Sequence, residues 1–229
     1  MLYTDREFRL ARLEEQAQFE DAEFIGCRFI RCVIEPRAVQ RCLNLDSRIV
    51  FSNCQLRNCV ETRCLVGPVI IRRCLLDGLQ SSHGGMRIDG AFFEQVTIRG
   101  NVGELRILSD ATGGVDSQFD MALVQANQKL YSGIDWAIDI ADAHSDGLVV
   151  YGVPPELIRY DHKRQAIIRR ANVEASYLDA IAACEQTIFG VCIGNLRYFP
   201  TADNVCVTIP ETSDISYHQQ ILAELRRLG

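Results

Sequence analysis

The spacing of the cysteines restricts the fold of this chain more than any other sequence feature. Seven of the 10 cysteines fall in one stretch, with gaps of 5, 10, 12, 5, 5 and 10 residues between neighbours: Cys27, Cys32, Cys42, Cys54, Cys59, Cys64 and Cys74. A period of five matches neither the period of about 3.6 residues of a helix nor that of about two residues of a strand. The spacing therefore indicates a repeat architecture.

A small residue precedes a large apolar residue by two positions in the first part of this stretch. The pairs are Ala17 and Phe19, Ala22 and Phe24, Cys27 and Phe29, and Cys32 and Ile34. If each five-residue unit forms one side of a narrow coil, both residues of a pair point inward, because a bulky side chain fits there only beside a small one. The other three positions of each unit then face water.

This pattern resembles the pentapeptide-repeat family, most clearly over residues 17–34. The resemblance implies a right-handed parallel β-helix, a solenoid in which four units make one square coil of about twenty residues. We therefore expect a mainly β chain with an N-terminal cap at 1–16 and a β-helix at 17–110. A linker and a further coil are expected at 111–153, and a smaller C-terminal α/β capping region at 154–229.

The spacing also predicts which cysteines lie above one another. Cys54 and Cys74 are 20 residues apart, or one coil, and the 12-residue gap before Cys54 is interpreted as ten residues plus a two-residue insertion. We therefore expect Cys32, Cys54 and Cys74 to stack on one inner face, and Cys42 with Cys64 on another. As small buried residues of a coil, these cysteines are expected to be structural thiols rather than zinc ligands or disulfide partners.

The second half contains shorter and more varied patterns. Apolar residues favour a helix at 116–130 and a further coil from about Asp135 to Val153, which Pro154 and Pro155 should stop. The segments 157–160 and 166–168 are predicted to form a hairpin. The α/β region is completed by three further elements: helices at 172–189 and 216–228 and a short strand at 205–209.

The acidic charge is concentrated in the second half. The net charge is −6: residues 1–110 contain 15 Arg and 15 acidic residues, whereas residues 111–229 contain 9 basic and 15 acidic residues. The neutral first half argues against nucleic-acid binding. Some pentapeptide-repeat proteins imitate duplex DNA and occupy type II topoisomerases, but such a mimic needs a strongly negative rod, so it is only an alternative here. An acidic second half favours a basic protein partner.

The densest polar cluster lies at the start of the predicted further coil. It consists of Asp135, Asp139, Asp142, His144 and Asp146. Carboxylates and an imidazole at this spacing could bind a divalent metal, so a metal-dependent enzyme using Asp139, Asp142 and His144 is a second alternative. The same spacing also fits outward positions of a coil. We therefore predict a binding surface formed by Trp136, Asp139, Asp142 and Asp146.

These observations favour a non-enzymatic protein-binding module. One concrete version is a bacterial immunity or inhibitor protein directed at a basic toxin or enzyme. We assign no catalytic residue, metal or cofactor, and leave self-association open. Residues 1–12 are charged and no stretch is long and apolar enough to span a bilayer, so we expect a cytoplasmic location, reduced cysteines and no membrane partner.

Overall fold

The structure is a computed structural model in which the chain is mainly β, with parallel sheets and few helices, as the sequence predicts. The structure describes residues 2–9, 12–13, 18–20, 23–25, 27–30, 33–34, 48–81, 85–112, 115–145, 147–173, 194, 196, 199, 201–208, 219 and 223.

The described strands form four sheets, here named A to D. Sheet A contains, in spatial order, β1 (Leu2–Thr4), β5 (Glu23–Ile25), β9 (Gln55–Arg57), β13 (Leu75–Asp77), β17 (Val96–Val102), β19 (Ile138–Asp139) and β22 (Ile158–Arg159), with β20 (Ala143–Ser145) also paired to β17. Sheet B contains β2 (Glu7–Arg9), β6 (Arg28–Ile30), β10 (Val60–Thr62) and β14 (Gln80–Ser81).

Sheets C and D complete the set. Sheet C contains β3 (Arg12–Leu13), β7 (Val33–Ile34), β11 (Leu65–Val66), β15 (Met86–Asp89), β18 (Leu105–Leu108), β21 (Leu148–Tyr151), β24 (Asn204–Thr208) and β23 (Gln165–Arg169). Sheet D contains β4 (Gln18–Glu20), β8 (Ile49–Ser52), β12 (Val69–Arg72) and β16 (Phe92–Glu94). The helical elements with full bounds are α1 (Ser117–Tyr131) and the 3-10 turn η2 (Pro155–Leu157).

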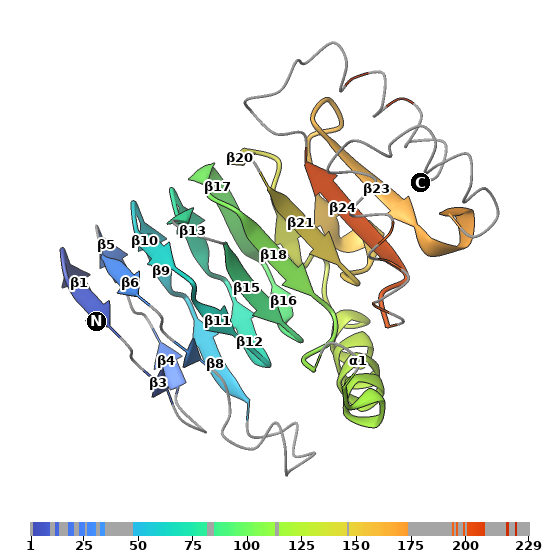
Figure 1. The fold of residues 1–229 in the computed structure, drawn as a ribbon, viewed down its shortest axis with the longest axis horizontal. Coiled ribbons are helices and arrows are strands. Elements are labelled where there is room, and N and C mark those ends of the chain that lie inside the picture. The colour runs from blue at the N-terminus through green and yellow to red at the C-terminus, as the bar shows by residue number, and fades with distance from the viewer. Residues whose placement is uncertain are drawn as a thin grey trace.

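Consecutive strands lie in different sheets. From β1 to β16 the chain visits sheets A, B, C and D in turn and then returns to sheet A, and each of β1 to β13 pairs with the strand four places later. The pairs are parallel except those of β24 with β21 and with β23. The strands therefore follow one another across the molecule from the N-terminal end, where β1 lies, toward β23 and β24 (Figure 1).

The pairing of β9 with β13 has the register that the cysteine spacing predicts. Gln55 lies opposite Leu75, which is 20 residues later. The Leu75 amide donates to the Cys54 carbonyl at 2.9 Å, and the Cys54 amide donates to Cys74 Sγ at 3.3 Å. Cys54 and Cys74 are therefore neighbours on adjacent strands, as predicted.

Cys32 lies outside the described residues, but strand β7 after it does not pair with the strand after Cys54, as its predicted stacking on Cys54 requires. Strand β9, which follows Cys54, pairs with β5, whereas β7, which follows Cys32, pairs with β11, which follows Cys64. These pairs are 32 residues apart, so the insertion has about twelve residues and falls between Ile34 and Arg48. The five-residue spacing alone does not distinguish an insertion of two residues from one of twelve, because the same spacing resumes after either. Cys42, predicted to stack on Cys64, lies outside the described residues.

Left-handed backbone recurs at five-residue intervals in three runs, over residues 53–63, 73–78 and 90–100. The φ angles lie between 50° and 72° at Asn53, Asn58, Arg63, Arg73, Gly78, Gly90, Gln95 and Gly100. Asparagine and glycine adopt this conformation at low cost, so their recurrence marks the turns between strands. Each strand is accordingly only a few residues long before the chain turns into the next sheet.

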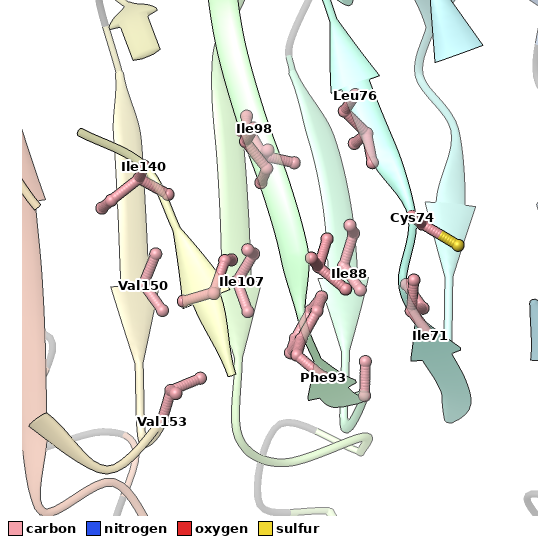
Figure 2. Close-up of a cluster of buried hydrophobic side chains, with 14 of the residues drawn as sticks. Ile71, Cys74, Leu76, Ile88, Phe93, Ile98, Ile107, Ile140, Val150 and Val153 are labelled. Carbon is pink, nitrogen blue, oxygen red and sulfur yellow. The ribbon is translucent and has the colours of Figure 1, made fainter. Parts of the chain in front are cut away.

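The apolar core lies between the four sheets. Figure 2 shows its side chains in rows that cross successive strands: Leu76, Ile98 and Ile140; Ile88, Ile107 and Val150; Ile71, Phe93 and Val153. All nine residues are buried. The strand register places Leu76 beside Ile98 and Ile88 beside Ile107, so residues of similar shape lie above one another through the core.

Residues 1–16, expected to form a cap, contain strands of the same sheets. Strands β1, β2 and β3 pair in parallel with β5, β6 and β7, each 21 residues later. Residues 86–108, which belong to the predicted β region at 17–110, form strands β15 to β18.

Several elements of the second half also appear where they were predicted. Helix α1 matches the predicted helix at 116–130, and β19, β20 and β21 continue the parallel pairing with β17 and β18. Strand β24 matches the strand predicted at 205–209. Most of the helices predicted at 172–189 and 216–228 lies outside the described residues.

Two predictions for residues 154–169 are wrong. Pro154 and Pro155 do not end the parallel pairing, because β22 follows them and pairs with β19. Strand β23 does not form a hairpin with β22; it pairs antiparallel with β24. This pairing adds two antiparallel strands beyond β21, so the C-terminal region covers that edge of sheet C as expected. Among the described residues, no helix is long and apolar enough to cross a bilayer.

The close approach of adjacent strands is testable at Gly103. A Cβ at this position would lie 2.2 Å from the Ser81 amide nitrogen, whereas a Cβ at Gly133 would have its nearest neighbour, the Leu130 carbonyl oxygen, at 3.7 Å. We predict that Gly103→Ala lowers the free energy of unfolding by about 2–3 kcal/mol, because the backbone must shift. Gly133→Ala should change it by less than about 0.5 kcal/mol in the same urea titration. Equal values for the two variants would contradict this packing.

Candidate functional site

The predicted binding residue Trp136 lies at the margin of sheet A. Its ring is half-buried, and the Arg159 guanidinium lies 4.2 Å from the ring centroid. Asp139 is the direct register partner of Arg159, and the preceding residues, Ile138 and Ile158, are buried. Because side chains alternate along a strand, Asp139 and Arg159 point away from the core and lie on the same outer face.

The other predicted residues are separate from one another. The Asp139 carboxylate accepts a hydrogen bond from the Ala141 amide at 3.1 Å. Asp142 is exposed, and Arg164 Nη1 donates to Nδ1 of His144 at 2.7 Å. No group of three or more His, Cys, Asp or Glu side chains that could hold a metal ion occurs in the part of the chain that the structure describes. Asp146 lies outside that part.

Two rows of outward residues make the outer surface of sheet A continuous. One row runs across five strands in register: Gln55, Leu75, Thr97, Asp139 and Arg159. The second row contains Arg57, Asp77 and Arg99, in which Asp77 pairs with Arg99 at 2.8 Å and with Arg57 at 3.7 Å. All of these residues are half-buried or exposed. We call these two rows, with Trp136, the sheet A face.

The outer surface of sheet C is covered at the same end of the molecule. All four residues of β21 are buried, because Leu148 and Val150 point into the core between the sheets while Val149 and Tyr151 pack in a second apolar cluster. That cluster includes residues from β23 and β24, and Tyr151 contacts Phe199 with ring centroids 5.1 Å apart. Sheet A, unlike sheet C, therefore presents outward side chains to solvent here.

Helix α1 covers the end of sheet D through a stripe of residues four apart. Phe119, Leu123, Asn127 and Tyr131 are buried. The Tyr131 hydroxyl accepts a hydrogen bond from the Phe93 amide at 3.4 Å, on the last strand of the sheet. Asn127 accepts from Arg48 Nη1 at 2.6 Å and donates to the Gly90 carbonyl at 3.3 Å.

Three buried carboxyl groups, which the sequence analysis did not single out, lie near the start of α1. Asp120 accepts hydrogen bonds from the Ala111 and Thr112 amides at 2.9 and 3.0 Å. Asp89 accepts from Arg87 Nη2 at 2.7 Å, whereas neither carboxylate oxygen of Asp110 has a hydrogen-bond partner among the residues that the structure describes. Burial, opposed by Arg87 and reinforced by the neighbouring charges of Asp110 and Asp120, raises the pKa of Asp89 to about 6. Burial also raises the pKa of Asp110.

Glu61 is a fourth buried carboxyl group, and the sequence contained a signal for it. It follows Cys59 by two positions, which is where a large apolar residue is expected, and it pairs in register with Phe29. Its Oε2 accepts a hydrogen bond from the Cys64 amide at 3.0 Å, and burial raises its pKa. No comparable signal marks Asp89, Asp110 and Asp120, because the position of α1 against the sheets is not part of the repeat.

The described cysteines are buried and unsuited to thiolate chemistry. Cys54, Cys59 and Cys74 each donate through Sγ to the carbonyl two residues earlier, at 3.4, 3.5 and 3.2 Å. Burial raises the pKa of Cys59 to about 11 and that of Cys206 to about 12. A raised pKa disfavours the thiolate form that metal binding and nucleophilic attack require.

No known family model matches this chain, and no curated protein matches it. A function therefore has to be inferred from the exposed side chains, and the sheet A face is the candidate that the geometry supports.

The buried carboxyl cluster predicts an unusual pH dependence of stability. A carboxyl group with a higher pKa in the folded than in the unfolded state stabilises the fold while protonated, so Asp89 should contribute less as the pH rises from about 4 through about 6. We predict that Asp89→Asn is destabilising or neutral at pH 4. By pH 7 its free energy of unfolding should have risen by about 2–3 kcal/mol relative to that of the natural chain. Urea titrations across this range measure the difference, with the exposed Glu156→Gln as control. A constant difference for Asp89→Asn would contradict the prediction.

Proposed function

We propose that this chain is a non-enzymatic protein-binding module built on a right-handed parallel β-helix of the pentapeptide-repeat type. The fold proposal is supported by the rotation of successive strands through four sheets. It is also supported by register steps of 20 residues between β9 and β13 and 22 between β13 and β17, and by left-handed turns at five-residue intervals over residues 53–63, 73–78 and 90–100. A rigid coil of this kind leaves its outer faces available to partners.

The observation that carries the binding proposal is the Arg159 guanidinium stacked over Trp136 at the margin of the sheet A face. Tryptophan and arginine are the residues most enriched among those that dominate protein–protein binding energy. Their mutual stacking at 4.2 Å orders both side chains before a partner binds, which reduces the entropy lost on association. The strands below hold Arg159 in place, since Ile158 next to it is buried.

The charges around Trp136 favour a basic partner. Asp135 and Asp142 are exposed and Asp139 is half-buried, so three carboxylates close to Trp136 in the sequence are accessible to a partner. Residues 111–229 carry the whole net charge of −6, and complementary charge accelerates association with a basic surface. An immunity or inhibitor protein directed at a basic toxin or enzyme is the version that these features fit.

The test is the identification of a stoichiometric partner and the mapping of its contact. The chain is used to capture proteins from the cytosol of its native host, the partner is identified by mass spectrometry, and the Kd is measured by calorimetry. We predict that Trp136→Ala and Arg159→Ala each raise the Kd about tenfold or more. The matched control is Met121→Ala on α1, where Met121 is 50% exposed, and it should leave the Kd unchanged.

Circular dichroism spectra establish that the variants are folded before their affinities are compared. A Kd that is the same for Trp136→Ala and Met121→Ala would place the contact elsewhere and overturn the proposed site. A chain that captures no protein but turns over a small substrate would overturn the binding function itself.

A further inference from the structure

Among the described strands, β2 is the edge strand at the N-terminal end of sheet B. Sheet B has the order β14-β10-β6-β2, so among the described residues β2 pairs with β6 on one side only. The neighbouring strand β1 marks this end of the molecule in Figure 1. A strand with one free edge presents backbone donors and acceptors that can pair with a strand of another chain.

The three residues of β2 carry charges that are symmetric about the central residue. Glu7 and Arg9 are exposed on the outer surface, and Phe8 between them is half-buried against Tyr3, with ring centroids 5.8 Å apart. Glu7 Oε1 and Arg9 Nη2 are 2.9 Å apart. In an antiparallel pairing of two β2 strands centred on Phe8, each Glu7 lies directly opposite the Arg9 of the other copy.

We propose that this edge is a homodimerisation surface, in which β2 pairs antiparallel with β2 of a second copy about a two-fold axis through Phe8. The occupant is a second copy because the charge pattern of β2 complements itself only in this orientation. A two-fold axis is also the commonest symmetry of protein homodimers. The surface is separate from the sheet A face, so the inference does not depend on the proposed partner.

The physical basis is the sign of the charges that meet across the pair. Opposite charges directly across two strands stabilise the pairing, and like charges destabilise it by a similar amount. The ion pair within β2 is exposed and contributes about 0–1 kcal/mol, so rearrangement to bridge two copies costs little. Leu2 on β1, which is 61% exposed at the same end, adds apolar surface that a second copy would cover.

A charge-exchange experiment on the full chain tests the proposal. Analytical ultracentrifugation over a range of concentrations measures the dimer Kd. Glu7→Arg and Arg9→Glu each place like charges across the pair, so each should weaken dimerisation about tenfold or more. The double variant Glu7→Arg/Arg9→Glu should restore the original Kd, because opposite charges again meet.

The two single variants also test one another. An equimolar mixture of Glu7→Arg and Arg9→Glu chains should form a heterodimer with about the original affinity, since one chain supplies both positive and the other both negative residues. The control is Arg106→Glu on β18, a strand flanked by β15 and β21, where Arg106 pairs with Glu104 in the same two-residue spacing. This variant should not change the Kd.

Three results would overturn the proposal. The natural chain could be monomeric at every concentration, or its dimer could be insensitive to both single substitutions. Both single variants could also dissociate without restoration by the double variant or by the mixture, which would mean that their charges do not meet across a two-fold axis.

Discussion

Parallel hydrogen bonding between neighbouring strands of the same sheet is the interaction on which the rest of the structure depends. The bonds recur at the cysteines: Leu75 donates to Cys54, Thr97 to Cys74 and Val60 to Cys27, each at 2.9 Å. Once this register is set, alternation along each strand decides which side chains enter the core and which face water. The apolar rows of the core and the polar rows of the sheet A face are therefore two consequences of the same backbone pairing.

Two parts of the structure depart from this regular parallel pairing, namely helix α1 and the antiparallel strands β23 and β24. Helix α1 lies against the end of sheet D and brings buried carboxyl groups near one another, and within the described part of the chain Asp110 has no hydrogen-bond partner. Such groups cost stability at neutral pH, because charged carboxylates are poorly solvated there. The antiparallel strands β23 and β24 end sheet C, so its outer surface is covered while that of sheet A stays accessible.

The period of five predicted the short strands and the register of β9 with β13, because it is a local signal. Left-handed turns such as Asn53 and Asn58, each followed by a buried cysteine, translate that period directly into strands and corners. The register across the insertion before Arg48 was not predictable, because the five-residue spacing looks the same after an insertion of two residues as after one of twelve. Strands β23 and β24 are far apart in the sequence, so no local pattern predicts their pairing. A hairpin between neighbouring segments was therefore predicted instead, and it is wrong.

The candidate site was predicted only in part. Trp136 and Asp139 do lie on or beside an outer face, since outward positions follow from the repeat. The stacking of Arg159 on Trp136 depends on β22 pairing with β19 beyond two prolines, which local rules had been expected to prevent. The burial of Glu61 could be predicted from its position two residues after Cys59. The burial of the carboxyl groups beside α1 could not, because it depends on how the helix packs against the sheets, which the five-residue spacing does not specify.

The register of the strands is the central claim, and scalar couplings across hydrogen bonds measure it directly by NMR on labelled protein. The account predicts couplings from the Leu75 amide to the Cys54 carbonyl, from Thr97 to Cys74 and from Val60 to Cys27. A coupling from the Gln55 amide to the Cys32 carbonyl, with none between Val60 and Cys27, would contradict it. That result would restore the two-residue insertion and displace the pairing of the first strands relative to all the others.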